Sequence, residues 1–148
     1  MYLEKEGREK EFLLMKILNN TNIKMELDIK GDFNIDEITH VLQVRPTTYW
    51  EKGDKVNEKL NHSYTLWSYS SSAVETLDIK DAQVELEKIF IPKKEILYKL
   101  KKLYNLQYTI EIIITIVRNE LPAIYFENDF LEFITRIGGD IDIDMYSM

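Results

Sequence analysis

The run from Tyr108 to Val117, Y-T-I-E-I-I-I-T-I-V, constrains the fold more than any other feature of the sequence. Its apolar residues alternate, so one face of an extended segment carries Tyr108 and four isoleucines, while Ile113 and Val117 add partial burial to the other face. A strand that is apolar on both faces belongs in the interior of a sheet. The sequence therefore predicts a central β-strand at 108–117.

Other segments show the alternation or the residue types that are typical of strands. They are residues 24–29, 63–70 and 140–146. Residues 123–127 follow Pro122 and a short turn at Asn119-Glu120, which predicts a further strand antiparallel to the central one.

Helices are expected between these strands, because capping residues and helix stops flank apolar periodic segments. Asn34, with Glu37 three residues later, is typical of a capping box and predicts a helix over 35–43. The other helices are predicted over 78–90, from Pro92 to about 104, and from Asn128 to the glycine pair 138–139.

These elements give the order β-α-β-α-α-β-β-α-β, an α+β fold with a five-stranded mixed sheet and helices packed mainly on one face. Each half holds a strand, a turn, a short helix and another strand, which raises internal duplication as an alternative reading. Residues 1–22 are expected to form an N-terminal extension with a short helix at 8–18. Residues 23–148 are expected to form a single domain, since a chain of 148 residues has the usual size of one.

The charge and the residue types of the chain argue against several functions. A net charge of -7 disfavours nucleic acid and anionic membranes and favours basic partners. The chain has no cysteine, so disulfides and thiolate chemistry are absent, and His40 and His62 lie in polar surroundings. No phosphate-binding loop, zinc motif or signal peptide is present, and no apolar run approaches the roughly 20 residues of a membrane span. We expect a cytoplasmic protein.

Two aromatic segments offer candidate binding residues. The loop 47–54 combines rings, hydroxyls and charges as recognition loops do, although Trp50 could instead plug the edge of the core above a turn at Gly53. The strand at 63–70 could line a groove with that loop, although strand aromatics are usually core. The candidates for binding are Trp50, Lys52, Asp54, Trp67, Tyr69 and Ser71.

A row of acids closes the chain, at Asp140, Asp142 and Asp144. Alternation places the three carboxylates on one strand face at intervals of about 7 Å. Side chains from one strand do not converge on a metal ion, so no metal site and no cofactor is predicted. The row is expected to be a solvated face neutralised by Lys24 or Lys30, or an acidic surface that meets a basic partner.

Three segments, KGDFNIDEITHVLQVRPTTYWEKGD, LWSYSSS and IGGDIDIDMY, resemble an uncharacterised bacterial family, the domain of unknown function numbered forty-two seventy-nine. The resemblance covers Lys24 to Tyr146 and implies no activity, substrate or catalytic set. It marks candidate surface or framework positions at Gly31, Phe33, Thr39, Pro46, Trp50, Gly53, Asp54, Trp67, Ser71, Asp142, Asp144 and Tyr146.

The sequence favours a small acidic interaction protein, for which immunity-like neutralisation of a basic partner is one example. The alternative is a small-ligand-binding domain, or with weaker support an enzyme, that uses a pocket of aromatic and acidic residues. No catalytic residue is assigned, because no arrangement of nucleophile, base and acid is recognisable. The oligomeric state is not determined by the sequence.

Overall fold

The computed structural model describes residues 7–10 and 19–148. The strands in this part of the chain are β1 (Asn22–Gly31), β2 (Thr48–Trp50), β3 (Thr65–Ser70), β4 (Val74–Glu75), β5 (Gln107–Ile116) and β6 (Gly139–Ser147). The helices between them are α2 (Ile35–Leu42), α3 (Ile79–Phe90), α4 (Lys94–Tyr104) and α5 (Asn128–Ile137), with a 3-10 turn η1 (Ile91–Lys93) before α4.

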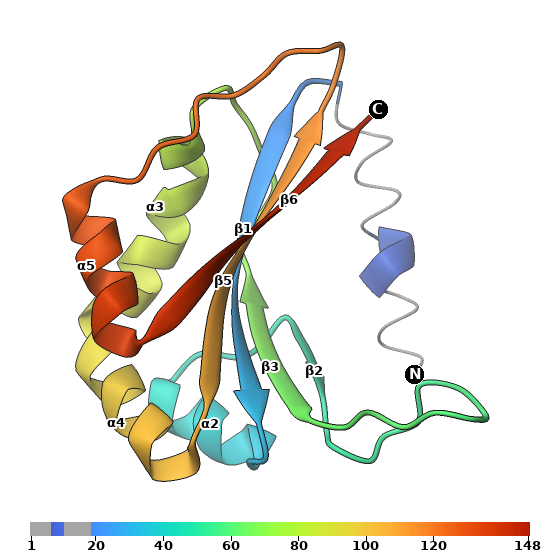
Figure 1. Cartoon of the computed structure of the whole chain (residues 1–148), viewed down its shortest axis with the longest axis vertical. Coiled ribbons are helices and arrows are strands. Elements are labelled where there is room, and N and C mark those ends of the chain that lie inside the picture. Colours follow the sequence, from blue (N-terminus) through green and yellow to red (C-terminus); the bar gives the residue numbers. More distant parts are fainter. Residues whose placement is uncertain (1–6, 11–18) are drawn as a thin grey trace.

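The strands form one mixed sheet in the order β2-β3-β1-β5-β6, and β4 pairs with β1 off this path. Every pairing is antiparallel except β5 with β6, which are parallel because α5 carries the chain back across the sheet. β5 lies between β1 and β6, as its two-sided apolar pattern predicts. The α+β class, the mixed sheet and the helices on one face are confirmed (Figure 1).

Helices α2 to α5 cover one face of the sheet, and the other face, on which no helix of residues 19–148 lies, is called the open face below (Figure 1). Contacts fix which residues face the helices: the Tyr108 hydroxyl donates to the Leu97 carbonyl on α4, and Trp67 packs edge-on against Phe90 of α3. Alternation then directs the odd-numbered residues of β1 and the even-numbered residues of β5 into the core. The strand residues buried there include Ile23, Met25, Leu27, Ile29, Trp67, Tyr108, Ile110, Ile112 and Ile114.

The predicted caps account for most helix boundaries. Asn34 Oδ1 accepts the Glu37 N–H at 2.9 Å, and Asp78 Oδ1 accepts the Lys80 N–H at 3.0 Å. Gly138, with φ of 67°, ends α5 in the left-handed conformation that glycine adopts without strain. Asn128, predicted to cap α5, is instead its first helical residue, and Glu127 occupies the cap position.

The predicted strand at 123–127 is wrong. Ala123 forms an isolated bridge with Asp78, and its N–H donates to the Leu77 carbonyl at 2.8 Å, so the segment runs beside the start of α3. The left-handed pair Arg118 and Asn119, with φ of 53° and 58°, turns the chain away from the sheet. Both edges of β5 are already occupied by β1 and β6, so no place beside it remains.

Two short strands, β2 and β4, were not predicted, and the order from β1 to β6 is β-α-β-β-β-α-α-β-α-β. The predicted helix at 8–18 lies mostly outside the described residues, of which 7–10 are helical. None of the helices described is both long enough and apolar enough to cross a membrane.

Candidate functional site

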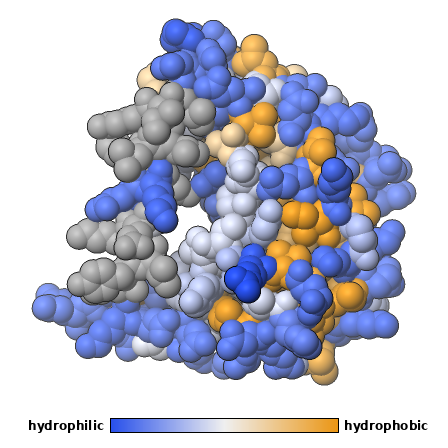
Figure 2. All heavy atoms as spheres, turned by 180° about the vertical axis from the view of Figure 1, so that it is seen from behind, coloured by the Kyte–Doolittle hydropathy of each residue, from blue (hydrophilic) through white to orange (hydrophobic). Residues whose placement is uncertain are grey.

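The open face of the sheet carries a cleft of about 450 Å³, on the side away from the helices. Residues 7–10 also lie on this side (Figure 1). In a view from behind, hydrophobic residues gather mostly over the helical side, while the rest of the surface is largely hydrophilic (Figure 2). The cleft is lined by Gly7, Arg8, Lys24, Glu26, Asp28, Lys30, Thr48, Trp50, Tyr64, Leu66, Ser68, Glu111, Ile113 and Tyr146.

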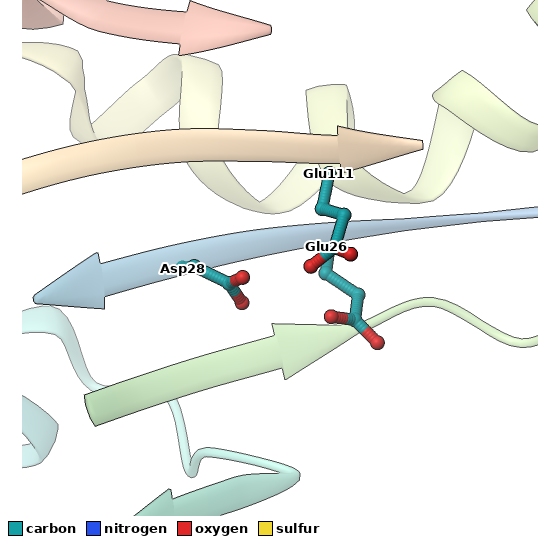
Figure 3. A group of neighbouring side chains, drawn as sticks. All are labelled: Glu26, Asp28 and Glu111. Carbon is teal, nitrogen blue, oxygen red and sulfur yellow. The ribbon is translucent and has the colours of Figure 1, made fainter. Parts of the chain in front are cut away.

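Three carboxylates from two neighbouring strands converge in this cleft. Glu26 and Asp28 belong to β1 and Glu111 to β5, and one oxygen from each lies within 4.8 Å of the others. Their side chains rise from the same face of the sheet, with Glu111 reaching over β1 (Figure 3). Strand alternation fixes this arrangement, because the residues between them point into the core.

Asp28 is the most deeply buried of the three acids, with 7% of its surface exposed. Its Oδ1 accepts a hydrogen bond of 2.6 Å from the Ser68 hydroxyl on β3, the register partner of Asp28. Glu26 lies 3.5 Å from the Lys24 ammonium on the same strand. A buried carboxylate needs such partners, because its desolvation is otherwise costly.

Glu111 is the acid whose protonation the site changes most. Burial raises its pKa from the ordinary 4.5 to about 9, helped by hydrogen bonds to Asp144 and Asp28 and by the negative charges of Asp28 and Glu26. At neutral pH Glu111 therefore keeps its proton. The protonated carboxyl group can donate to a neighbouring carboxylate, which lets several acids share a small space.

Aromatic rings form one wall of the cleft. Trp50, at the end of β2, stacks on His62 with ring centroids 4.1 Å apart, and it also meets Tyr64 at 5.8 Å. The Trp50 Nε1–H donates to the Tyr64 carbonyl at 3.1 Å, and the Lys30 ammonium lies 5.3 Å from the centre of the Tyr64 ring. The stack and the hydrogen bond hold the Trp50 ring in place, and the rings of Trp50 and Tyr64 line the same cleft as the acids.

Of the six predicted binding residues, Trp50 alone lines the cleft. The Lys52 ammonium lies 3.4 Å from an Asp32 carboxylate oxygen. Asp54 accepts the Glu51 N–H at 2.8 Å, which stabilises the turn containing Gly53.

The other three predicted binding residues belong to the framework. Trp67 is fully buried on the helical side, where its Nε1–H donates to Thr39 Oγ1 at 3.1 Å. Tyr69 donates to Glu85 on α3, and the Ser71 hydroxyl oxygen accepts the Met25 N–H. Trp50 and Trp67 therefore lie on opposite faces of the sheet and do not form one site.

The predicted acidic row lies on the open face of β6. Asp140 and Asp142 are exposed, while Asp144 is half-buried and reaches Glu111. The lysines expected to neutralise this row lie on β1, which is not adjacent to β6, because β5 separates the two strands. Lys24 lies beside Glu26, and Lys30 lies over Tyr64.

The carboxylates of Glu26, Asp28 and Glu111 were missed by the reasoning from sequence. Each interrupts an apolar strand, which is a recognisable signal, but the register of β1 against β5 is needed to bring them together. Their oxygens are the ligand type that hard cations prefer, and among residues 7–10 and 19–148 these three form the group that could hold such an ion. The same oxygens can equally accept hydrogen bonds from ammonium or guanidinium groups.

Comparison with known proteins identifies one family. A family model described as a domain of unknown function (DUF4279) matches residues 21–148, so the resemblance noted over Lys24 to Tyr146 is confirmed. The comparisons with curated proteins and with solved structures gave no match.

Proposed function

The chain belongs to the DUF4279 family, whose description assigns no activity, and we propose that it is a binding module that receives cationic side chains of a basic partner in its open-face cleft. The observation that carries this proposal is the convergence of three carboxyl groups within 4.8 Å in a cleft of about 450 Å³.

The carboxyl groups of the cleft offer acceptors to a cationic group, and the chain's own Lys24 and Lys30 line the cleft beside them. The whole chain carries a net charge of -7, and the proton on Glu111 indicates that negative charge is already crowded there. A guanidinium or ammonium group entering the cleft relieves this crowding, and a guanidinium can also bind a carboxylate through two hydrogen bonds. The chain itself brings Arg8 to the lining of the same cleft.

The aromatic wall suits the same class of ligand. The rings of Trp50 and Tyr64 line the cleft that holds the carboxylates, and cations gain energy over such π faces. Large rigid rings also provide contact area at little cost in side-chain entropy. A basic protein held in this way could be neutralised, as in an immunity-like role.

Nuclear magnetic resonance titration with argininamide and with its neutral analogue citrullinamide tests the proposal. Argininamide is expected to shift amide signals of β1 and β5 around the cleft, and citrullinamide is expected to shift them far less. In the double variant Glu26→Gln/Asp28→Asn the response to argininamide should weaken by about tenfold or more. The matched control Glu58→Gln/Glu120→Gln removes two exposed carboxylates that do not line the cleft and should respond as the wild type does.

Equal shifts with both probes, or an undiminished response in the cleft variant, would rule the proposal out. Pull-down from a native lysate at low and high salt then identifies the partner. A specific partner is expected to be basic, to be released by salt, and to be lost with the cleft variant but kept with the control.

The alternative is a small-molecule site in the same cleft, favoured by its concavity and by the stacked pair Trp50 and His62. Trp67 and Ser71, first expected in such a pocket, lie on the helical side or in the framework and take no part in it. Thermal-shift screening against sugars, nucleotides and divalent ions discriminates between the two functions. A neutral compound that raises the unfolding midpoint in a Trp50-dependent way would favour this alternative.

A further inference from the structure

The outer edge of β6 forms one end of the sheet. Over residues 7–10 and 19–148 no strand pairs with this edge, whereas the inner edge pairs with β5 along the whole of Gly139–Ser147. A free edge of that length presents main-chain donors and acceptors to any extended segment, so proteins usually block such edges or use them. The position of β6 is visible in Figure 1.

The hydrogen bonds to β5 determine which residues of β6 present their main chain outward. The Met148 N–H donates to the Ile116 carbonyl at 2.9 Å, directly continuing the parallel register. In a parallel pair the N–H and C=O of one residue point to the same side and those of the next residue to the other. The even-numbered residues therefore bond to β5, and Ile141, Ile143 and Met145 direct their main-chain groups away from it.

The side chains of β6 divide between two faces of the sheet. Asp140, Asp142 and Asp144 lie on the open face, while Ile141 and Ile143 pack against the core on the helical side. A second copy of β6 pairing edge to edge would place its own acids beside these three on the same face, and like charges in cross-strand positions are destabilising. Charge complementarity instead favours a strand with basic side chains on this face.

We propose that the outer edge of β6 accepts an added β-strand from a basic partner. Lysine or arginine at alternate positions of that strand would face Asp140, Asp142 and Asp144, and the apolar residues between them would extend the layer of Ile141 and Ile143. Strand addition of this kind takes its affinity from main-chain hydrogen bonds and its specificity from alternate side chains.

This inference rests on the proposed function in one respect, the basic nature of the partner, and it adds how that partner is held. The edge and the cleft are continuous, because Asp144 hydrogen-bonds to Glu111. A partner strand on β6 thus places its basic side chains beside the acids of the cleft.

The probe for the test is a peptide that alternates lysine and valine over the length of β6, compared with one that alternates glutamate and valine. Binding of the lysine peptide is expected to slow hydrogen exchange at the amides of Ile141, Ile143 and Met145. The glutamate peptide is expected not to bind. Lysine-peptide binding without that protection, or no binding at all, would overturn the inference.

Met145→Pro provides the matched variant, since Met145 is 55% exposed and its N–H points outward. Proline removes that donor without removing a bond to β5, so affinity for the lysine peptide should fall by about tenfold. Met145→Ala keeps the donor and should bind nearly as the wild type does. Unchanged affinity in the proline variant would count against strand addition.

The argininamide titration separates this inference from the proposed function. The proline variant should still bind argininamide in the cleft, which also verifies that it is folded. If the wild type does not respond to argininamide but the lysine peptide still protects the amides of β6, the proposed function is ruled out and the strand-addition inference stands. If argininamide binds in the cleft but the lysine peptide gives no protection at β6, the strand-addition inference is ruled out and the proposed function stands.

Discussion

Glu26 and Glu111 are direct register partners across the antiparallel β1–β5 ladder. Two ionised carboxylates in such a position repel each other, and the raised pKa of Glu111 removes that repulsion at neutral pH. The pair is thus maintained by a proton, which makes the stability of the domain sensitive to pH and to substitution at either residue.

Glu111→Gln should flatten the dependence of stability on pH. The pKa of Glu111 is about 9 in the folded protein and ordinarily 4.5, so between these values the folded state holds a proton that the unfolded state releases. This contribution to the free energy of unfolding is full below about pH 4.5 and declines as the pH rises toward about 9. Urea unfolding across this range measures the slope. An unchanged slope in Glu111→Gln, relative to an exposed control such as Glu120→Gln, would contradict the assignment.

Asp28→Asn should lower the pKa of Glu111, because it removes one of the negative charges that raise it. The asparagine oxygen can still accept the Ser68 hydroxyl, so the fold should persist. Carbon-detected titration of the Glu111 carboxyl group follows the change. Asp129→Asn, on α5 at the other side of the sheet, should leave that titration where it is in the wild type.

Ser68→Ala should destabilise the domain by about 1–3 kcal/mol, because a buried carboxylate loses a donor. The bond concerned joins the Ser68 hydroxyl to Asp28 at 2.6 Å in a buried setting. Denaturant unfolding gives the value, with Ser72→Ala as control, since Ser72 is exposed. If the two alanine variants were equally stable, the hydrogen bond would contribute nothing measurable.

The two tryptophans should differ in their fluorescence, and substitutions of them should differ in their effect on stability. Trp67 is fully buried, so it should resist quenching by iodide and emit at shorter wavelength, whereas Trp50 lines the open cleft. Trp67→Ala is expected to cost about 3–5 kcal/mol through the cavity it leaves. Trp50→Ala should cost clearly less, and under the proposed function it should mainly impair binding in the cleft. Equal quenching in the two single-tryptophan variants Trp50→Phe and Trp67→Phe would contradict the difference in exposure between the two rings.

Gly138→Ala should cost about 1–2 kcal/mol, because an L side chain is strained at positive φ. The φ of Gly138 is 67°, and an added Cβ would lie 3.1 Å from the Lys101 ammonium nitrogen. The adjacent Gly139→Ala is the matched control, since its Cβ would make ordinary contacts of 3.5 Å with Ile137. Thermal unfolding of both variants checks the difference, and a smaller loss at 138 than at 139 would contradict it.

Local pattern was enough to predict the elements that carry their own periodicity. The apolar alternation at 108–117, the N-cap at Asn34 and the glycine stop at 138 each specify structure over a few residues, and each is confirmed. The strand at 123–127 failed for a reason outside its own sequence, because both edges of β5 were already occupied. Short β2 and β4 carry too few residues to show a period.

The candidate site was largely hidden from the sequence, because it depends on register. Glu26 and Glu111 are 85 positions apart, and only the β1–β5 pairing places them face to face. The sequence indicated that the two tryptophans are candidates but did not determine which face of the sheet each one occupies. Trp50 and Trp67 lie on paired strands, yet neighbouring residues of a strand point to opposite faces, and a shift of one position reverses the assignment.

The odd-numbered and even-numbered residues of β1 point to opposite faces of the sheet. From Ile23 to Ile29 the odd positions are fully buried in the core, whereas Lys24, Glu26 and Asp28 line the cleft. Substitutions at even positions can therefore change the lining of the cleft while the odd positions preserve the scaffold. The lining of the cleft and the packing of the core occupy the same ten residues of β1 and can vary separately in evolution.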